Sequence, residues 1–280
     1  KIFLTSINLL DLFLWTFRRN EKDVVNLYNA LSPVMQLATG GNMLNFGYWN
    51  AENTNPISAQ ENLCAVFAKM AELNSCKNIV DVGSGLSAPA IFWRNNFKNS
   101  STFCVNINYD QLCHSSPQQK ITFLNSSSTK LPFTDNSVER VLALESSQHF
   151  KPFSDFILES KRILSDSGLL ILALPITLTS SSISKLGILK FTWSSEHYSL
   201  DEVRKIIVSK GFVISEEKLI GSSVYDPLAD YYAKNRDELK KSILKQYSPF
   251  VEKILFRSIQ KMKKASQEGV IDYVLLKCHL

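Results

Sequence analysis

Scarce glycine and unpaired cysteines limit what this sequence can be. Glycine accounts for only 10 residues, and nothing in the composition suggests extended disorder. The cysteines are odd in number, and no two have a CxxC spacing: Cys64, Cys76, Cys104, Cys113 and Cys278. Disulfide frameworks and tetrahedral zinc sites need closer, paired arrangements, so we expect free thiols in a reducing cytoplasm and no metal site.

The chain also lacks an apolar run long enough to cross a bilayer. The first twenty residues are strongly apolar, but Asp11 interrupts them and Arg18 and Arg19 follow. A membrane span needs roughly 20 consecutive apolar residues, and no small-residue cleavage site of a signal peptide follows. We expect an amphipathic helix that packs on the domain or covers a pocket, with contact to a membrane surface as the alternative.

Acidic residues are scarce near the C-terminus. The net charge of +5 is too mild to imply nucleic acid. Between Tyr231 and Ser266, however, ten basic residues face only three acidic ones, Asp237, Glu238 and Glu252. Apolar residues recur there at helical spacing, so we expect a cap helix with a solvated basic face. Attraction to an anionic substrate, a membrane or RNA is the alternative.

Short apolar runs alternate with helical patterns in most of the chain. The expected strands are Asn78–Val82, Thr102–Asn108, Lys120–Asn125, Val138–Leu144, Gly168–Leu174, Phe212–Leu219 and Val270–Lys277. The expected helices between them are Pro89–Phe97, Pro152–Leu164 and Leu200–Lys210. This alternation predicts an α/β, Rossmann-like fold, with a seven-stranded, mostly parallel sheet and helices on both faces.

A length of 280 residues suits one α/β domain, and no internal repeat or long linker divides the chain. We expect an N-terminal helical cap at residues 1–75, a core at 76–220 and the last strand at 267–280. One or two long helices should form a cap insertion at 221–266. Ligands in such sheets bind at the carboxyl ends of the strands, which directs the search to the turns after the first, second and fourth strands.

The strongest motif follows the first strand. The acid Asp81 precedes a turn, Gly83-Ser84-Gly85, and a helix begins shortly after it. Glycine lets the backbone approach a ligand closely, and the helix N-terminus presents free N–H groups. A dinucleotide site would need GxGxxG, but Ser87 and Ala88 stand where further glycines would be. The carboxylate of Asp81 suits a cationic amino group better than a pyrophosphate.

This acid-x-Gly-x-Gly turn resembles that of the class I S-adenosylmethionine (SAM)-dependent methyltransferases, and the resemblance continues downstream. It places Asn106 and Ile107 at the end of the second strand, where family members often carry an acid that binds the ribose. Gln111 is a further contact candidate. The segment 125–133 resembles the family's GDAxxLPF loop, with Ser127 at the position of the adenine-binding Asp and Ser128 after it.

The fourth strand runs into Leu144-Glu145-Ser146-Ser147-Gln148-His149. In the family's small-molecule branch a Glu-Ser pair and a nearby His commonly follow this strand, and the His often acts as general base. The pKa of an unperturbed His, near 6.5, suits removal of a proton from a hydroxyl group. The resemblance therefore implies that His149 is catalytic and that Glu145 orients a reactant. His197 is the rival base, and a merely structural His149 is the alternative.

Upstream, the segment Thr39–Trp49 resembles one that precedes the SAM-binding fold in sterol, tocopherol and macrolide-sugar methyltransferases. In those relatives the portion that corresponds to Gly47-Tyr48-Trp49 lies over the cofactor. This implies a hydrogen bond from Tyr48 to the methionine carboxylate. An aromatic staple that holds the N-terminal helices is the alternative interpretation.

These patterns favour a soluble, cytoplasmic enzyme that transfers a methyl group from SAM to a small, largely apolar molecule, with oxygen as the favoured acceptor and S-adenosylhomocysteine as the product. A non-catalytic SAM-binding module with a degenerate site is the main alternative, because Ser87, Asn106 and Ser127 depart from the family pattern. An RNA methyltransferase is a further one. The Asn/Asp-Pro-Pro-aromatic motif for exocyclic amines is absent after the fourth strand, so nucleic acid is disfavoured. The oligomeric state stays open.

Overall fold

The computed structural model describes residues 20–98, 100–115 and 119–280. The apolar N-terminal segment that we expected to form an amphipathic helix falls in residues 1–19, outside the described residues. Among the described residues, no helix is both long and apolar enough to cross a membrane.

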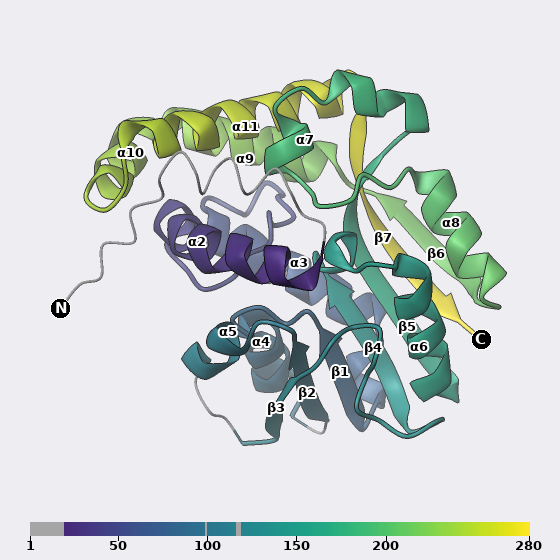
Figure 1. Ribbon diagram of the computed structural model, residues 1–280. Helices are drawn as coiled ribbons and strands as arrows, with labels where there is room; N and C mark the ends of the chain where they lie inside the picture. Colours follow the sequence, from purple (N-terminus) through teal and green to yellow (C-terminus); the bar gives the residue numbers. More distant parts are fainter. Residues whose placement is uncertain (1–19, 99, 116–118) are drawn as a thin grey trace.

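A seven-stranded sheet runs through the molecule in the order β3-β2-β1-β4-β5-β7-β6 (Figure 1). The strands are β1 (Asn78–Val82), β2 (Ser101–Asn106), β3 (Ile121–Asn125), β4 (Val138–Leu144), β5 (Leu164–Thr177), β6 (Val213–Leu219) and β7 (Ile271–His279). All neighbours pair in parallel except β7, which runs antiparallel to β5 and β6. The predicted Rossmann-like α/β fold is therefore confirmed.

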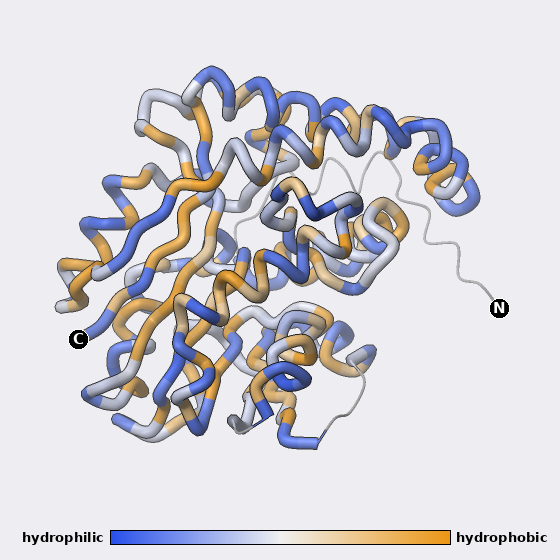
Figure 2. Tube along the Cα trace, turned by 180° about the vertical axis from the view of Figure 1, so that it is seen from behind, coloured by the Kyte–Doolittle hydropathy of each residue, from blue (hydrophilic) through white to orange (hydrophobic). Residues whose placement is uncertain are grey.

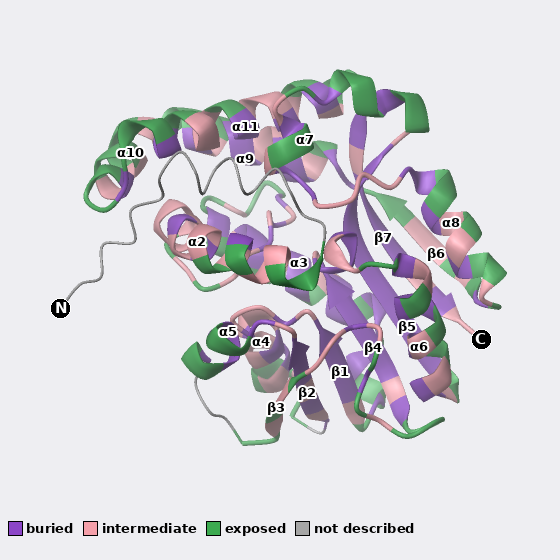
Figure 3. Ribbon diagram, in the orientation of Figure 1, coloured by how far each residue is buried: buried purple, intermediate pink, exposed green. Residues whose placement is uncertain are grey.

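Helices cover both faces of the sheet, so its central strands are buried (Figure 3). Successive side chains of a strand point to opposite faces, and in β1 this sends Ile79 into one apolar cluster and Val80 into the other. The first cluster includes residues of α3 (Pro56–Met70), α4 (Ala88–Asn96), α9 (Ser222–Lys234) and α11 (Pro249–Gln267). The second includes residues of α6 (Phe153–Ile163) and α8 (Leu200–Ser209). Figure 2 shows the apolar colour concentrated along the strands and the polar colour on the outer helices.

The N-terminal region differs in part from the expected all-helical cap. Helix α2 (Glu21–Thr39) begins at Asn20, whose side chain accepts a hydrogen bond from the backbone N–H of Asp23, and it ends at Gly40 with φ of 78°. Helix α3 begins only after Asn55, which caps it. The residues between the two helices form an irregular segment instead. This segment matters for the site, because it lies against the carboxyl end of the sheet.

Between β6 and β7 the chain forms three helices, α9, α10 (Arg236–Leu244) and α11, where we expected one or two. Asn235 ends α9 and also begins α10, and Pro249 opens α11 directly after Ser248. Proline is favoured in the first helical turn, because its missing N–H has no partner there in any case. The predicted helical character of this region is confirmed, whereas its division into three helices differs from the expectation.

Candidate active site

A pocket lies where β1, β2 and β4 end, beneath helix α2, and the space between its walls, open mouth included, is about 950 Å³. Ten residues singled out from the sequence line it: Gly83, Ser84, Gly85, Asn106, Ile107, Gln111, Ser128, Leu144, Glu145 and His149. Residues from four separate turns thus meet at the carboxyl edge of the sheet, because parallel strands all end on that side.

The glycine turn forms the floor of the pocket. Gly83 has φ of 74° and Gly85 has φ of 55°, which L-residues with a side chain rarely adopt. A Cβ at Gly83 would lie 2.5 Å from Cβ of Ser146 and 3.1 Å from Cζ of Phe150. At Gly85 a Cβ would meet only Leu44, at 3.6 Å. Glycine is therefore favoured at position 83 by both conformation and space, and at position 85 by conformation alone.

Asn106 sits in a buried hydrogen-bond network. Its Nδ2 donates to the Gly85 carbonyl at 3.1 Å and to Gln111 Oε1 at 2.9 Å, and its Oδ1 accepts from the backbone N–H of Asn108 at 3.3 Å. Both amide hydrogens are thus engaged within the protein. Only a remaining lone pair on Oδ1 can accept a hydrogen bond from a ribose hydroxyl, since an amide oxygen carries two.

Three of the expected site residues do not line the pocket. Asp81 is buried with only 3% exposure, and Tyr48 packs against the apolar cluster around α3. The backbone of Tyr48 bonds to Ala59 and Asn62, which favours the aromatic staple. Ser127 hydrogen-bonds to Glu21 of α2. Its hydroxyl therefore fastens a helix over the pocket.

Asp81 nevertheless lies directly before the glycine turn. Burial raises the pKa of its carboxyl to about 7. Its Oδ2 atom is buried without a hydrogen-bond partner among the residues that the structure describes. A buried carboxylate without a partner is costly, and a cation bound nearby would lower that cost. This orphaned oxygen, directly before the glycine turn, fits the ammonium group of a methionine moiety.

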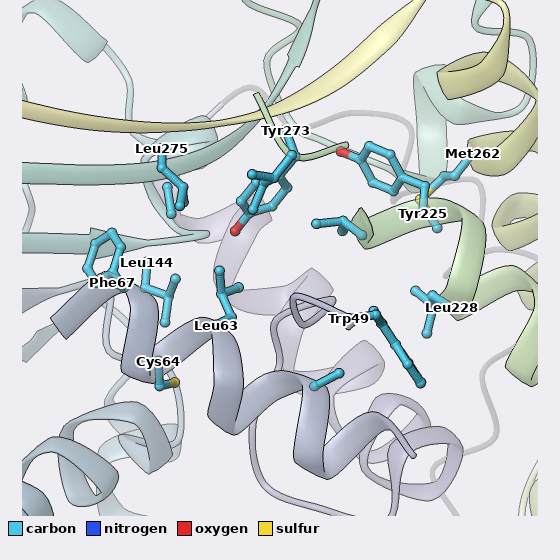
Figure 4. Close-up of a cluster of buried hydrophobic side chains, with 14 of the residues drawn as sticks. Trp49, Leu63, Cys64, Phe67, Leu144, Tyr225, Leu228, Met262, Tyr273 and Leu275 are labelled. Atoms are coloured by element: carbon cyan, nitrogen blue, oxygen red, sulfur yellow. The ribbon is translucent and has the colours of Figure 1, made fainter. Parts of the chain in front are cut away.

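Glu145 stands at the end of β4 in a strained conformation, with φ of 54°. Its Oε2 accepts hydrogen bonds from the backbone N–H of Phe46 and from the Tyr273 hydroxyl, both at 3.0 Å. Figure 4 shows the Tyr273 ring pointing from β7 into the apolar cluster that also holds Leu63 and Leu144. Burial in this apolar setting raises the pKa of the Glu145 carboxyl to about 8, although both hydrogen bonds oppose the rise. At neutral pH the group is therefore mainly protonated.

His149 closes the short helix η2 (Ser147–His149) and is hydrogen-bonded through both ring nitrogens. Its Nδ1 lies 2.6 Å from Ser195 Oγ, and its Nε2 lies 2.7 Å from the Tyr28 hydroxyl. Nε2 also lies 3.2 Å from Nε2 of Gln148, whose amide can only donate. This pattern is consistent with a proton on Nδ1 and a basic Nε2. The rival His197 does not line the pocket, and its Nε2 bonds to the Lys190 carbonyl.

Helix α2 covers the pocket and was not assigned to the site from the sequence. Four of its residues line the pocket at a spacing of three, four and seven residues: Glu21, Val24, Val25 and Tyr28. This spacing places the four residues on one helical face. The sequence shows the periodicity, but it does not show that this face covers the pocket. Asn42, Leu44 and Asn45 of the following irregular segment also line the pocket. All three belong to the segment that the resemblance marks, although only Tyr48 was singled out from it.

The residues present fit SAM. The pocket combines a glycine floor that a Cβ would fill, polar groups at the ends of β2 and β3, and an orphaned carboxylate beside the turn. Among the described residues, no group of three or more His, Cys, Asp or Glu side chains is arranged to hold a metal ion.

Comparisons with known proteins agree with this geometry. Residues 80–172 match the family model described as a methyltransferase domain. The erythromycin 3''-O-methyltransferase of Saccharopolyspora erythraea is 26% identical over 266 residues, which cover 86% of this chain and 85% of that protein.

Two solved structures share the fold at low sequence identity. The mycolic acid cyclopropane synthase CmaA1, solved with S-adenosylhomocysteine, has a TM-score of 0.77 at 16% identity, covering 90% of this chain and 95% of that one. The [4+2]-cyclase SpnF has a TM-score of 0.76 at 16% identity, covering 93% and 96%. The domain match, the related enzyme and the pocket agree with one another: residues 80–172 match a methyltransferase domain, and the chain as a whole resembles the small-molecule branch of the class I S-adenosylmethionine-dependent methyltransferases.

Proposed function

We propose that this enzyme methylates a hydroxyl oxygen of a small, largely apolar molecule, with His149 as general base. The observation that carries the proposal is the hydrogen-bonding of His149, which presents Nε2 at the pocket wall and holds Nδ1 against Ser195. The name of the related erythromycin O-methyltransferase supports an oxygen acceptor. Val24, Val25, Leu44, Leu144 and Phe150 in the lining support an apolar one.

When bound, SAM would supply a methyl group on a cationic sulfur: the acceptor oxygen bonds to the methyl carbon as the carbon–sulfur bond breaks, and S-adenosylhomocysteine leaves. The residues that would hold the cofactor are the Gly83–Gly85 backbone, Asn106, Ile107, Gln111, Ser128 and Leu144. Asp81, buried directly before the glycine turn, would attract its ammonium group. His149 Nε2 takes the proton of the acceptor hydroxyl, which replaces the Tyr28 hydroxyl at this nitrogen when the acceptor binds. Ser195 holds Nδ1 and so keeps the imidazole oriented toward that proton.

Glu145 orients a reactant rather than exchanging the proton. Its pKa near 8 leaves it mainly protonated at neutral pH, so it can donate a hydrogen bond to an acceptor oxygen or to the cofactor. The proposal requires residues 1–280 to act as one domain, because α2, the sheet and β7 all contribute to the pocket wall or to its supporting bonds.

A panel of acceptors tests the function. We would incubate the full chain with methyl-labelled SAM and three classes of probe: macrolide glycosides with a free sugar hydroxyl, phenols, and secondary amines. Label transfer to a hydroxyl, with loss of about 10²–10⁴-fold in kcat for His149→Ala, is the expected result for a general base. S-adenosylhomocysteine binding, measured by calorimetry, should be retained in that variant.

Two outcomes would overturn the proposal. Transfer to amines alone would move the acceptor to nitrogen. An unchanged kcat in His149→Ala would show that the histidine is not the general base.

The second candidate function is a SAM-binding module that transfers no methyl group. It is favoured by the two hydrogen bonds within the protein that occupy both amide hydrogens of Asn106. Cofactor binding without label transfer to any probe would support it.

A further inference from the structure

The outer side of α11 carries a stripe of cations. Its members recur every three or four residues, so they share one face of the helix: Lys253, Arg257, Lys261 and Lys264. The one acid on α11, Glu252, is 2% exposed and pairs with Arg236 at 3.0 Å. The exposed side of α11 therefore carries positive charge without an acid along its length.

The turn between α10 and α11 extends this stripe. Leu244 and Phe250 flank the turn and are 38% and 45% exposed. Lys240, Lys241 and Lys245 are also exposed there. The exposed acids of α10, Asp237 and Glu238, lie in its first turn, within three or four residues of Lys240 and Lys241 but at the opposite end of the helix from Leu244 and Lys245. We call the α11 stripe together with Lys240, Lys241, Leu244, Lys245 and Phe250 the hairpin surface.

Few acidic side chains of the described residues form ion pairs with the cations of the hairpin surface. In the ranges 20–98, 100–115 and 119–280, no ion pair joins Lys245, Lys253 or Arg257 to an acid. Lys264 contacts Glu268 at 3.7 Å. Figure 1 shows α10 and α11 along one edge of the molecule, away from the centre of the sheet. In Figure 2 this edge is largely hydrophilic in colour.

We propose that the hairpin surface docks on an anionic lipid membrane. Lysine and arginine clusters are attracted to acidic headgroups, while exposed apolar side chains at the same place can enter the acyl boundary. Leu244 and Phe250 supply those side chains at the turn. Lys245 follows Leu244 directly, and Lys253 lies one helical turn beyond Phe250.

Two other partners fit the surface less well. RNA would match the charge, but burial of Leu244 gains nothing on a phosphate backbone, and single-stranded recognition relies on stacking aromatics beside the cations. A second copy of the chain would bring like charges together, which opposes association. A negatively charged bilayer is the partner that uses both the cations and the exposed apolar tip.

Vesicle sedimentation tests the docking with the full chain. The wild type should sediment with phosphatidylcholine vesicles that contain phosphatidylglycerol, and not with pure phosphatidylcholine, and added salt should weaken the binding. Lys253→Gln/Arg257→Gln should weaken it about thirty-fold, since each cation near the surface contributes about 1 kcal/mol. Phe250→Ser should weaken it about tenfold or more, because the insertion of an apolar side chain is lost.

Helix α8 and the residue after it offer matched controls, since Lys205, Lys210 and Val208 (58% exposed) lie outside the hairpin surface. Lys205→Gln/Lys210→Gln and Val208→Ser should bind vesicles like the wild type. All variants should bind S-adenosylhomocysteine like the wild type, which shows that they are folded and separates this test from the transfer reaction.

Three results would overturn the inference: no binding of the wild type to vesicles, equal binding to neutral and anionic vesicles, or undiminished binding by the variants of the hairpin surface. Tighter binding to an RNA homopolymer, lost in the same variants, would assign the surface to RNA instead.

Discussion

At the scale of single residues, glycine is favoured in the Gly83–Gly85 turn for two different reasons, a positive φ and a lack of space for a Cβ. Gly83 and Gly85 share a positive φ, but only Gly83 is enclosed by neighbouring atoms. Glu145 and Ser87 adopt positive φ values of 54° and 59° with side chains present. The left-handed conformation alone is thus tolerated in this site, whereas a close approach of Ser146 is not compatible with a Cβ at Gly83.

We therefore expect Gly83→Ala and Gly85→Ala to differ in stability. Gly85→Ala should lower the free energy of unfolding by about 1–2 kcal/mol, the cost of a Cβ in the left-handed region. Gly83→Ala should add about 1–3 kcal/mol to this loss, because the new Cβ overlaps Ser146 and Phe150. Urea unfolding at one pH would measure both values. Equal losses in the two variants would show that Ser146 moves aside without cost.

At the scale of elements, helix α2 is fastened to the loops that hold the cofactor. Gln111 Nε2 donates to Ser32 Oγ at 3.0 Å, and Asn108 Nδ2 donates to Asn29 Oδ1 at 2.7 Å. Helix α2 thus closes the pocket through polar bonds to α5 (Tyr109–His114) and to the residue that precedes it. Val34 anchors the second half of α2 in the first apolar cluster. Local opening is therefore expected of the part of α2 before Val34, which these polar bonds hold.

Ser32→Ala should loosen this helix. The variant leaves Gln111 Nε2 without its acceptor, at a cost of about 1–3 kcal/mol to the closed arrangement. Hydrogen exchange at backbone amides of α2 should rise about tenfold or more, while exchange in β1 stays unchanged. Thr39→Ala is the matched control, because its hydroxyl bonds only within and just after α2. Equal exchange in both variants would mean that apolar packing, not the polar bonds, holds α2 closed.

At the scale of the whole molecule, two buried carboxyl groups make stability depend on pH. The pKa of Glu145 is raised to about 8 and that of Asp81 to about 7, both by burial. A raised pKa means that the folded state binds a proton that the unfolded state has released. The stabilisation is therefore complete below the ordinary carboxyl pKa and is lost as the pH rises through the folded value.

Wild-type stability should fall between pH 5 and pH 8.5 by several kcal/mol. Glu145→Gln, which cannot ionise, should lose less stability over the same interval while keeping an acceptor for Phe46 N–H and the Tyr273 hydroxyl. Urea unfolding of both proteins at each pH gives the comparison, and Asp81 contributes equally to the two. Parallel curves would show that Glu145 is not the group that titrates.

Local sequence determined most elements of the fold. Apolar runs bounded by turn residues located β1 and β4 with the observed bounds, and α8 ends at Ser209, one residue before the expected end. Strand β5 extends beyond the predicted Gly168–Leu174 at both ends, to Leu164 and to Thr177. The first of these residues were not predicted because Ser165, Asp166 and Ser167 are polar. Propensity and periodicity act over a few neighbouring residues, so the sequence by itself shows them.

The sequence also determined which turns face the ligand, because parallel strands put all their carboxyl ends on one edge. Within these turns, the glycine motif and the resemblance to the methyltransferases singled out Gly83, Asn106, Glu145 and His149, and all four line the pocket. Their roles in binding and catalysis remain predictions that the variants above can test.

Only the tertiary structure decided which residues close the pocket and which merely neighbour it. Tyr28 and Ser195 lie 121 and 46 residues from His149 in sequence, yet both bond to its ring. Ser127 and Tyr48 occupy positions that the motifs mark, but their side chains or backbones are engaged with α2 and α3. Contacts between distant segments depend on how amphipathic faces pack together, and no local pattern encodes the partner of a face.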